Sequence, residues 1–309
     1  MEKVKKPMKI KNRICRTVYV LMVRSLALAK KFTNLCEVIA NRISINYTVR
    51  NFGFKTLVLA ITLLILSSAA PPPIGNKIDI IVIDPGHGGK DPGTMGKNLK
   101  EKDVALKISL KLGAYIEKNF PEVKVIYTRK DDRYIDLADR PLLANNEKAD
   151  LFICIHANAV EGVNAYGTET YVMGMHRSEG NMEVAQRENA VMLLDENYKE
   201  RYEGFDPNSP ESYILFSLTQ SAFFESSLKF AQKVESQFKN RVGRYSRGVR
   251  QAGFWVLWKT AMPSVLVEVG FLTNPTEETY LGSTKGQDEI ASGIFRAFRE
   301  YKEQIESLN

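Results

Sequence analysis

The chain has 309 residues, 44% of them hydrophobic and 26% charged, a composition that fits a folded protein and excludes a disordered chain, a collagen and a polytopic membrane protein. The formal net charge of +7 is unevenly distributed, because residues 1–70 hold 13 Lys or Arg and two Glu, a net charge of +11. Residues 71–309 therefore carry a net charge of −4. We expect no nucleic-acid partner for this larger part of the chain.

The first 70 residues read as an export segment. A basic stretch, 1–55, precedes the uncharged stretch 56–70, which contains an apolar run, ends in small residues and is followed by three prolines from Pro71. This order is typical of a secretory signal peptide, and the run is shorter than the roughly 20 residues of a membrane helix. A buried core helix is disfavoured because proline breaks helices. An uncleaved membrane anchor remains an alternative interpretation of 56–70.

The basic stretch 1–55 is longer than a signal peptide needs. Either translation starts downstream of Met1, or the stretch is a cytoplasmic arm that its positive charge retains inside. In both cases we expect the rest of the chain to be exported to the periplasm or cell envelope, with membrane contact only through the N-terminal segment.

After a linker, 71–77, the sequence predicts one α/β domain over 78–309, with a mainly parallel central sheet flanked by helices. Short β-branched runs alternate with segments whose apolar residues recur every three or four positions. The predicted strands are 78–84, 123–128, 151–156, 167–173, 254–258 and 264–269, and the predicted helices are 101–119, 137–146, 226–240 and 287–307. The polar stretch 174–226 breaks this rhythm and is interpreted as a helical insertion over the active-site face, with a helix at 183–195.

Histidine is scarce, and two of the three histidines follow predicted strands. His87 comes directly after the first strand, and His156 ends the third. Because the carboxyl ends of parallel strands share one edge of a sheet, we expect both imidazoles to meet there. Such a pair favours a metal site or a catalytic site over two unrelated structural histidines.

Glu101 is the candidate for a third ligand, since it opens the first predicted helix after the glycine-rich loop 85–96. Its alternative role is to complement the helix dipole. Two histidines, one carboxylate and a water form the open arrangement of a catalytic zinc ion, so we expect one Zn²⁺. The loop matches neither common phosphate-binding glycine pattern.

Glu268 is the candidate catalytic residue, because it lies inside the otherwise apolar run 265–272. A buried, unpaired carboxylate is costly, so its presence there suggests chemistry. Burial raises its pKa and a nearby cation lowers it, which suits a group that takes a proton from water and returns it to a leaving amine. The alternative is a structural glutamate paired with arginine or backbone groups.

Four motifs together closely resemble the zinc-dependent N-acetylmuramoyl-L-alanine amidases of bacterial cell walls, the type 3 amidase family. They are Asp84-Pro-Gly-His-Gly-Gly89, Glu101-Lys102, Ala149-Asp-Leu-Phe-Ile-Cys-Ile-His-Ala-Asn158 and Val267-Glu-Val-Gly-Phe-Leu-Thr-Asn274, in the order of the family. The resemblance covers residue 78 to the C-terminus. It implies zinc on His87, Glu101 and His156, catalysis by Glu268, and hydrolysis of the amide between the lactyl group of N-acetylmuramic acid and L-alanine in peptidoglycan.

The resemblance also bears on the residues around this site. Asn158 is expected to contact the substrate or to support a metal ligand, whereas Arg140 is expected to be structural and His176 to lie on the surface or in the groove. Some family members carry an insertion whose helix blocks the zinc cleft until an activator protein moves it, and 174–226 occupies the corresponding place. The possible blocking carboxylates are Glu183, Glu188 and Glu196. A plain wall of the substrate groove is the alternative.

The sequence also leaves two rival functions open. One is a zinc peptidase that acts on the stem peptide, because the same zinc ion and glutamate serve either reaction. The other is a non-catalytic peptidoglycan-binding regulator, against which the presence of all four key residues argues.

Overall fold

The computed structural model describes residues 77–307, apart from 161, 163, 176–177 and 214–221. The predictions for 1–76 and for His176 lie outside the described residues. In the part that is described, no helix combines the length and the apolar character that crossing a membrane requires.

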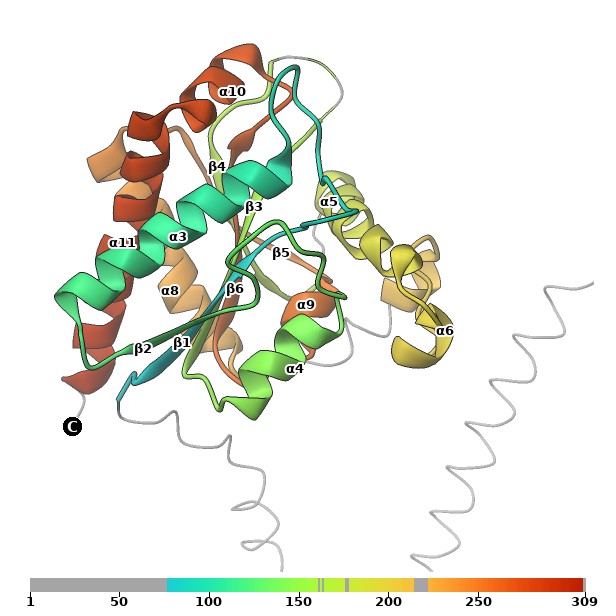
Figure 1. Ribbon diagram of the computed structural model, residues 1–309, viewed down its shortest axis with the longest axis horizontal. Coiled ribbons are helices and arrows are strands. Elements are labelled where there is room, and N and C mark those ends of the chain that lie inside the picture. The colour runs from blue at the N-terminus through green and yellow to red at the C-terminus, as the bar shows by residue number, and fades with distance from the viewer. Residues whose placement is uncertain (1–76, 161, 163, 176–177, 214–221, 308–309) are drawn as a thin grey trace, which may run out of the picture. The chain divides into compact units, whose positions relative to one another are not determined.

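A six-stranded sheet forms the centre of the domain (Figure 1). Its strands are β1 (Ile80–Pro85), β2 (Lys124–Tyr127), β3 (Leu151–Asn158), β4 (Thr168–Met173), β5 (Ser246–Ala252) and β6 (Ser264–Phe271), in the spatial order β2-β1-β3-β6-β4-β5. All neighbours are parallel except β4 and β6, which run antiparallel. The predicted α/β fold with a mainly parallel sheet is therefore confirmed.

Helices cover both faces of the sheet, so the two faces build two apolar cores. One face packs against α3 (Glu101–Asn119), α8 (Phe224–Gln237), α10 (Pro275–Gly282) and α11 (Thr284–Glu306). The other face, called the site face here, packs against α4 (Asp139–Asn146), α5 (Glu179–Asn189), the short 3₁₀ helix Ala190–Leu194 and α9 (Trp255–Trp258). Alternate residues of the central strands point to opposite faces, as Ile153 and Cys154 of β3 do.

Helix α3 shows how the sequence determines a local element. Glu101 and Asp103 lie in its first turn, where carboxylates complement the helix dipole. Val104, Ile108 and Leu112 recur every four residues and are buried against the sheet. The helix ends at Asn119, shortly before Pro121, so its predicted bounds agree with the structure.

The predicted strand 254–258 is wrong, because α9 occupies this stretch and β5 lies just before it. Trp255, Val256 and Leu257 are all buried, so the run shows no helical period. Strand β5 lies at the edge of the sheet and is half-buried, and its sequence, Ser-Arg-Gly-Val-Arg-Gln-Ala, lacks the apolar alternation of a strand.

Two predicted helices each consist of two helical segments. The helix predicted at 183–195 begins four residues earlier, because the Ser178 side chain caps it by accepting from the Asn181 N–H, and it continues as the 3₁₀ helix after Asn189. The predicted helix 226–240 is α8 followed by a π-helical turn, Phe238–Val242. Helix α10 was not predicted at all, although Asn274 caps it and Pro275 opens it. A short four-residue helix, α6 (Tyr198–Arg201), follows the 3₁₀ helix.

The candidate residues gather at the carboxyl edge of the parallel strands. His87 lies two residues beyond β1, while His156 and Glu268 are neighbours in register on β3 and β6. Helix α5 crosses this edge from the site face (Figure 1). The sheet thus supplies one wall of the site and α5 supplies another.

Candidate metal centre

His87 is held in an unusual backbone conformation at the start of the glycine-rich loop. Its φ angle is +59°, in the left-handed region that non-glycine residues rarely adopt. The Arg140 guanidinium donates to the His87 carbonyl at 2.9 Å and also binds Asp84 at 2.9 Å, which fixes the loop onto β1. The Asp91 carboxylate contacts Nδ1 of His87 at 2.7 Å and orients the ring, so that Nε2 faces the site.

Arg140 therefore has the structural place expected of it. It is buried together with Asp84, and this ion pair holds the pKa of the Asp84 carboxyl below its usual value despite the opposing effect of burial. Removing one partner of such a pair strands the other charge in the interior.

Glu101 and His156 complete the predicted group. The Glu101 carboxylate accepts hydrogen bonds from the backbone N–H of Thr94 at 2.7 Å and of Ala157 at 2.9 Å, so both of its oxygens are fixed. Its Oε1 atom lies 3.1 Å from His87 Nε2 and 2.9 Å from His156 Nδ1. The structure brings together all three side chains that the sequence predicts as ligands.

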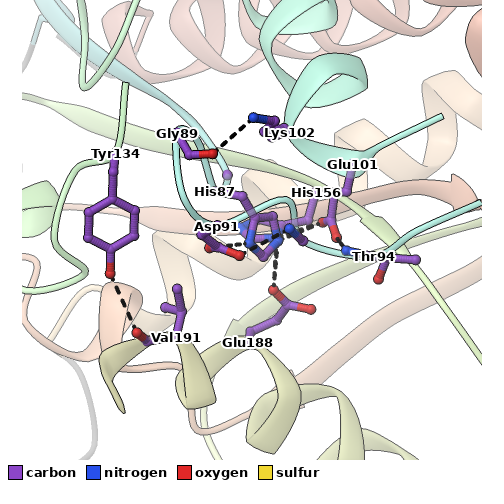
Figure 2. Close-up of polar contacts among 12 residues, drawn as sticks. His87, Gly89, Asp91, Thr94, Glu101, Lys102, Tyr134, His156, Glu188 and Val191 are labelled. Carbon is purple, nitrogen blue, oxygen red and sulfur yellow. Dashed lines mark hydrogen bonds and ion pairs between the residues drawn. The ribbon is translucent and has the colours of Figure 1, made fainter. Parts of the chain in front are cut away.

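Glu188 of α5 is a fourth member of this cluster (Figure 2). Its Oε2 atom lies 3.0 Å from His156 Nδ1 and 3.3 Å from His87 Nε2. The other two glutamates proposed from the sequence do not reach the site, because Glu183 and Glu196 are exposed. Of the three candidates, only Glu188 projects into the cluster.

The four side chains fit a metal ion of the zinc type. One ligand atom from each of His87, Glu101, His156 and Glu188 lies within 4.8 Å of all the others, and all four residues are buried. Tetrahedral ligands about 2.0 Å from zinc lie roughly 3.3 Å apart, close to the contacts seen here. His87 Nε2 and Glu188 Oε2 make no hydrogen bond within the described residues, although they are buried. Two buried polar atoms thus point at a common centre that a cation would satisfy.

The histidines and the carboxylates of this cluster compensate each other's charge. Burial by itself lowers the pKa of His87 and His156, but nearby groups outweigh this effect. Glu101 and Glu188 are among these groups, and the pKa of both imidazoles is raised well above the usual value. The cluster therefore favours positive charge at its centre.

Glu268 lies on β6 beside His156 and is completely buried. Neither carboxylate oxygen has a hydrogen-bond partner among the described residues, and the guanidinium of Arg187 is 3.9 Å from Oε1. Burial and the charges of Glu188 and Glu101 raise the pKa of Glu268 well above its usual value. Such a carboxyl group binds a proton readily, which is the property a proton-transfer residue needs.

Arg187 is a residue that sequence reasoning missed. Its guanidinium donates to Glu188 Oε1 at 3.0 Å, to Asn158 Oδ1 at 2.9 Å and to the Ala159 carbonyl at 3.1 Å. It thereby ties α5 to the end of β3. Nothing in the sequence distinguishes Arg187 from an ordinary surface arginine of a polar helix. Asn158, expected to contact substrate or to support a ligand, is engaged here by this arginine.

Gly86 makes room for the His156 ring and carries a testable prediction. A Cβ atom at position 86 would lie 2.5 Å from His156 Nε2. The Gly86→Ala chain is therefore expected to bind zinc at least about tenfold more weakly, measured by competition with a fluorescent chelator, because the ring must leave its place. Gly180→Ala is the control, since nothing lies within 4 Å of its Cβ. Equal zinc affinity in wild type and Gly86→Ala would contradict this arrangement.

The greater part of the chain matches a known protein family. A family model described as N-acetylmuramoyl-L-alanine amidase matches residues 81–300. The chain belongs to this family. The α/β fold and the buried His/Glu cluster are therefore those of a member of the amidase family.

Relatives of this amidase-family chain are known in sequence and in structure. The N-acetylmuramoyl-L-alanine amidase AmiC of Escherichia coli O6:H1 is 34% identical over 228 residues, which are 72% of this chain and 52% of that protein. The chain thus covers about half the length of this relative. The crystal structure of an N-acetylmuramoyl-L-alanine amidase from Clostridium difficile 630 matches 73% of this chain and 97% of its own, with 32% identity and a TM-score of 0.55. The CwlD amidase from Clostridioides difficile in complex with the GerS lipoprotein matches 72% of this chain and 98% of its own, with 26% identity and a TM-score of 0.53.

Proposed function

We propose that this protein is a zinc-dependent peptidoglycan hydrolase that cleaves the amide bond between the lactyl group of N-acetylmuramic acid and L-alanine. The observation that carries the proposal is the convergence of His87, Glu101 and His156 next to the buried, unpaired Glu268. Three ligands leave the fourth position of a tetrahedral ion open for reactants. Membership of the amidase family supports this bond as the target.

Each group has one task in this reaction. A zinc ion held by His87, Glu101 and His156 would polarise the scissile carbonyl and make water more acidic. Glu268 accepts the proton of the attacking water and delivers it to the nitrogen of L-alanine, which leaves as a free amine. Its buried position beside His156 suits it to hold that proton between the two transfers.

Glu188 blocks the reaction in this arrangement. Its carboxylate lies where water or the scissile carbonyl has to enter, and Arg187 fastens the same helix to Asn158. We propose that α5 is an autoinhibitory element and that a partner protein displaces it to withdraw Glu188 from the centre. The complex of the related CwlD amidase with the GerS lipoprotein supports a protein partner for this fold.

The location follows from the substrate. Peptidoglycan lies outside the cytoplasmic membrane, so we propose that the chain is exported to the periplasm or cell envelope. The basic segment followed by an apolar run in residues 1–70 supports export, whether that run is cleaved or retained as an anchor.

Removal of the metal tests the zinc requirement. Treatment of the full chain carrying Glu188→Ala, which removes the blocking carboxylate, with a chelator is expected to abolish release of peptides from isolated peptidoglycan, and stoichiometric Zn²⁺ is expected to restore it. In a matched pair of variants, His156→Ala is expected to lose bound zinc by elemental analysis, whereas substitution of exposed Glu183 by Ala leaves one zinc per chain. Full activity of the chelated, zinc-free protein would contradict the proposal.

A further inference from the structure

A groove continues from the metal centre across the site face toward β5. It encloses a cavity of about 430 Å³ whose lining includes Asn158, Glu169, Tyr171, Arg187, Arg247 and Arg250. Arg187 binds Glu188 and Asn158 and lies 3.9 Å from Glu268, so the groove begins at the catalytic edge. A volume of this size accommodates part of a peptide.

The strand register shows how the groove is built. His156 pairs with Glu268 across β3 and β6, and Glu268 pairs with Glu169 across β6 and β4. Directly paired residues point to the same face of a sheet, so these three side chains form one row. On β5, the next strand in that direction, Arg247 contacts Glu169 and extends the row.

A bulge places two arginines of β5 on this face. Residues three apart in a regular strand point to opposite faces. Here the register shifts between Thr168 and Thr170, where Arg247 and Gly248 stand opposite one residue of β4. Gly248 has a φ angle of +86°, which permits the bulge. Arg250 is paired with Tyr171, and both arginines line the same groove as a result.

A single carboxylate, Glu169, faces both arginines. The Nε atom of Arg247 lies 2.5 Å from Glu169 Oε1, and Arg250 approaches the same oxygen at 3.3 Å. The other oxygen of Glu169 accepts from Tyr171 at 2.7 Å and from Asn158 at 3.3 Å. One carboxylate thus serves two guanidinium groups, while Glu183, the other carboxylate of the lining, is exposed and pairs with neither arginine in the part of the chain that the structure describes.

Arg250 also has donor capacity to spare. Its Nε atom is buried and makes no hydrogen bond in the part of the chain that is described. Another donor binds Asn181 Oδ1 at 3.0 Å, and Asn181 belongs to the blocking helix α5. Displacement of α5 would free this donor as well. An anion with two oxygens would satisfy both groups, because guanidinium binds carboxylate in a forked geometry.

We propose that Arg247 and Arg250 form a subsite that binds a carboxylate on the peptide side of the scissile amide, so that the substrate is an acidic stem peptide. The proposal rests on the proposed function, because it places the peptide in the groove that begins at Glu268. The same helix, α5, then blocks both the metal centre and this subsite.

Binding of two synthetic peptides tests the subsite directly. The probes are N-acetylmuramoyl-L-alanyl-γ-D-glutamyl-L-lysine, which has a free α-carboxylate on its glutamyl residue, and the analogue in which this group is a carboxamide. The protein is the zinc-loaded full chain with Glu188→Ala to open the site and Glu268→Gln to prevent turnover. Calorimetry is expected to show about tenfold tighter binding of the acid than of the amide.

Variants of Arg250 test whether this residue causes the preference for the acid over the amide. Arg250→Gln is expected to bind acid and amide equally, whereas Arg250→Lys is expected to retain part of the preference because it keeps the charge. Arg133→Gln is the control, since Arg133 is exposed and pairs with Asp131 away from the groove. The proposal would be overturned if the chain that keeps both arginines bound the two peptides equally, or bound neither of them.

The proposed function is judged separately, by hydrolysis of peptidoglycan by the Glu188→Ala chain. Hydrolysis without a preference between the two peptides would refute the subsite and leave the function standing. A clear preference without hydrolysis would support the subsite and refute the function.

Discussion

Substitution of Glu188 by alanine is expected to raise the rate of peptidoglycan hydrolysis by the isolated chain at least about tenfold. The carboxylate of Glu188 occupies the approach to the cluster, 3.0 Å from His156 and 3.3 Å from His87. Its removal opens the fourth ligand position and takes away a hydrogen-bond partner of Arg187. A tenfold gain in rate corresponds to a free-energy difference of about 1.4 kcal/mol. The interaction of a charged carboxylate with the cluster can contribute more than this. The rate is measured as release of dye from labelled sacculi with zinc present.

Glu179→Ala is the matched control, because Glu179 lies on the same helix but is exposed and does not line the groove. It is expected to leave the rate unchanged. If Glu188→Ala kept its zinc and its fold but hydrolysed sacculi no faster than wild type, or more slowly, α5 would be a wall of the groove and not an inhibitor.

The second large effect concerns Glu268. The Glu268→Gln variant, made in the Glu188→Ala background, is expected to lose about 10³-fold in hydrolysis, since an amide cannot carry the proton from water to the leaving amine. Zinc content is expected to stay at one per chain. The free energy of unfolding of the metal-free chain is not expected to fall, because the substitution removes a buried carboxylate that has no hydrogen bond among the described residues.

Glu235→Gln supplies the contrast for this experiment. Glu235 is also a buried glutamate with a raised pKa, caused chiefly by burial, but it lies on the opposite face and accepts hydrogen bonds from Thr168, Thr170 and Ser246. Its substitution is expected to lower stability and to leave the rate per folded molecule unchanged. If Glu268→Gln retained most of the hydrolytic rate, Glu268 would be a structural residue.

The central strands and the site residues could be predicted from the sequence, because the segments with strand-like sequence are also the segments that are buried. The buried strands are β-branched runs, and His87, His156 and Glu268 interrupt or follow such runs at the ends where parallel strands meet. Glu101 follows the glycine-rich loop at a helix start. The geometry brings these residues together, while their roles in zinc binding and proton transfer stay predictions until they are measured.

Other features depend on contacts that the sequence does not reveal. Glu188 could not be separated from Glu183 and Glu196, because the choice depends on where Ser178 starts the helix and on how α5 crosses the sheet. Arg247 and Arg250 share one face only through the bulge at Gly248. The strand that holds them was missed, since an edge strand of polar residues lacks the alternation on which prediction relies.

Mass spectrometry of the reaction products tests the central claim most directly. Isolated peptidoglycan is incubated with the zinc-loaded Glu188→Ala chain, with the Glu188→Ala, Glu268→Gln chain as the inactive control. We predict intact stem peptides with a free L-alanine amine, together with glycan strands that have lost their peptides, from the first protein only. Shortened stem peptides or free amino acids would identify a peptidase, and the absence of any soluble product would leave a protein that binds peptidoglycan without cleaving it; either result would contradict the account.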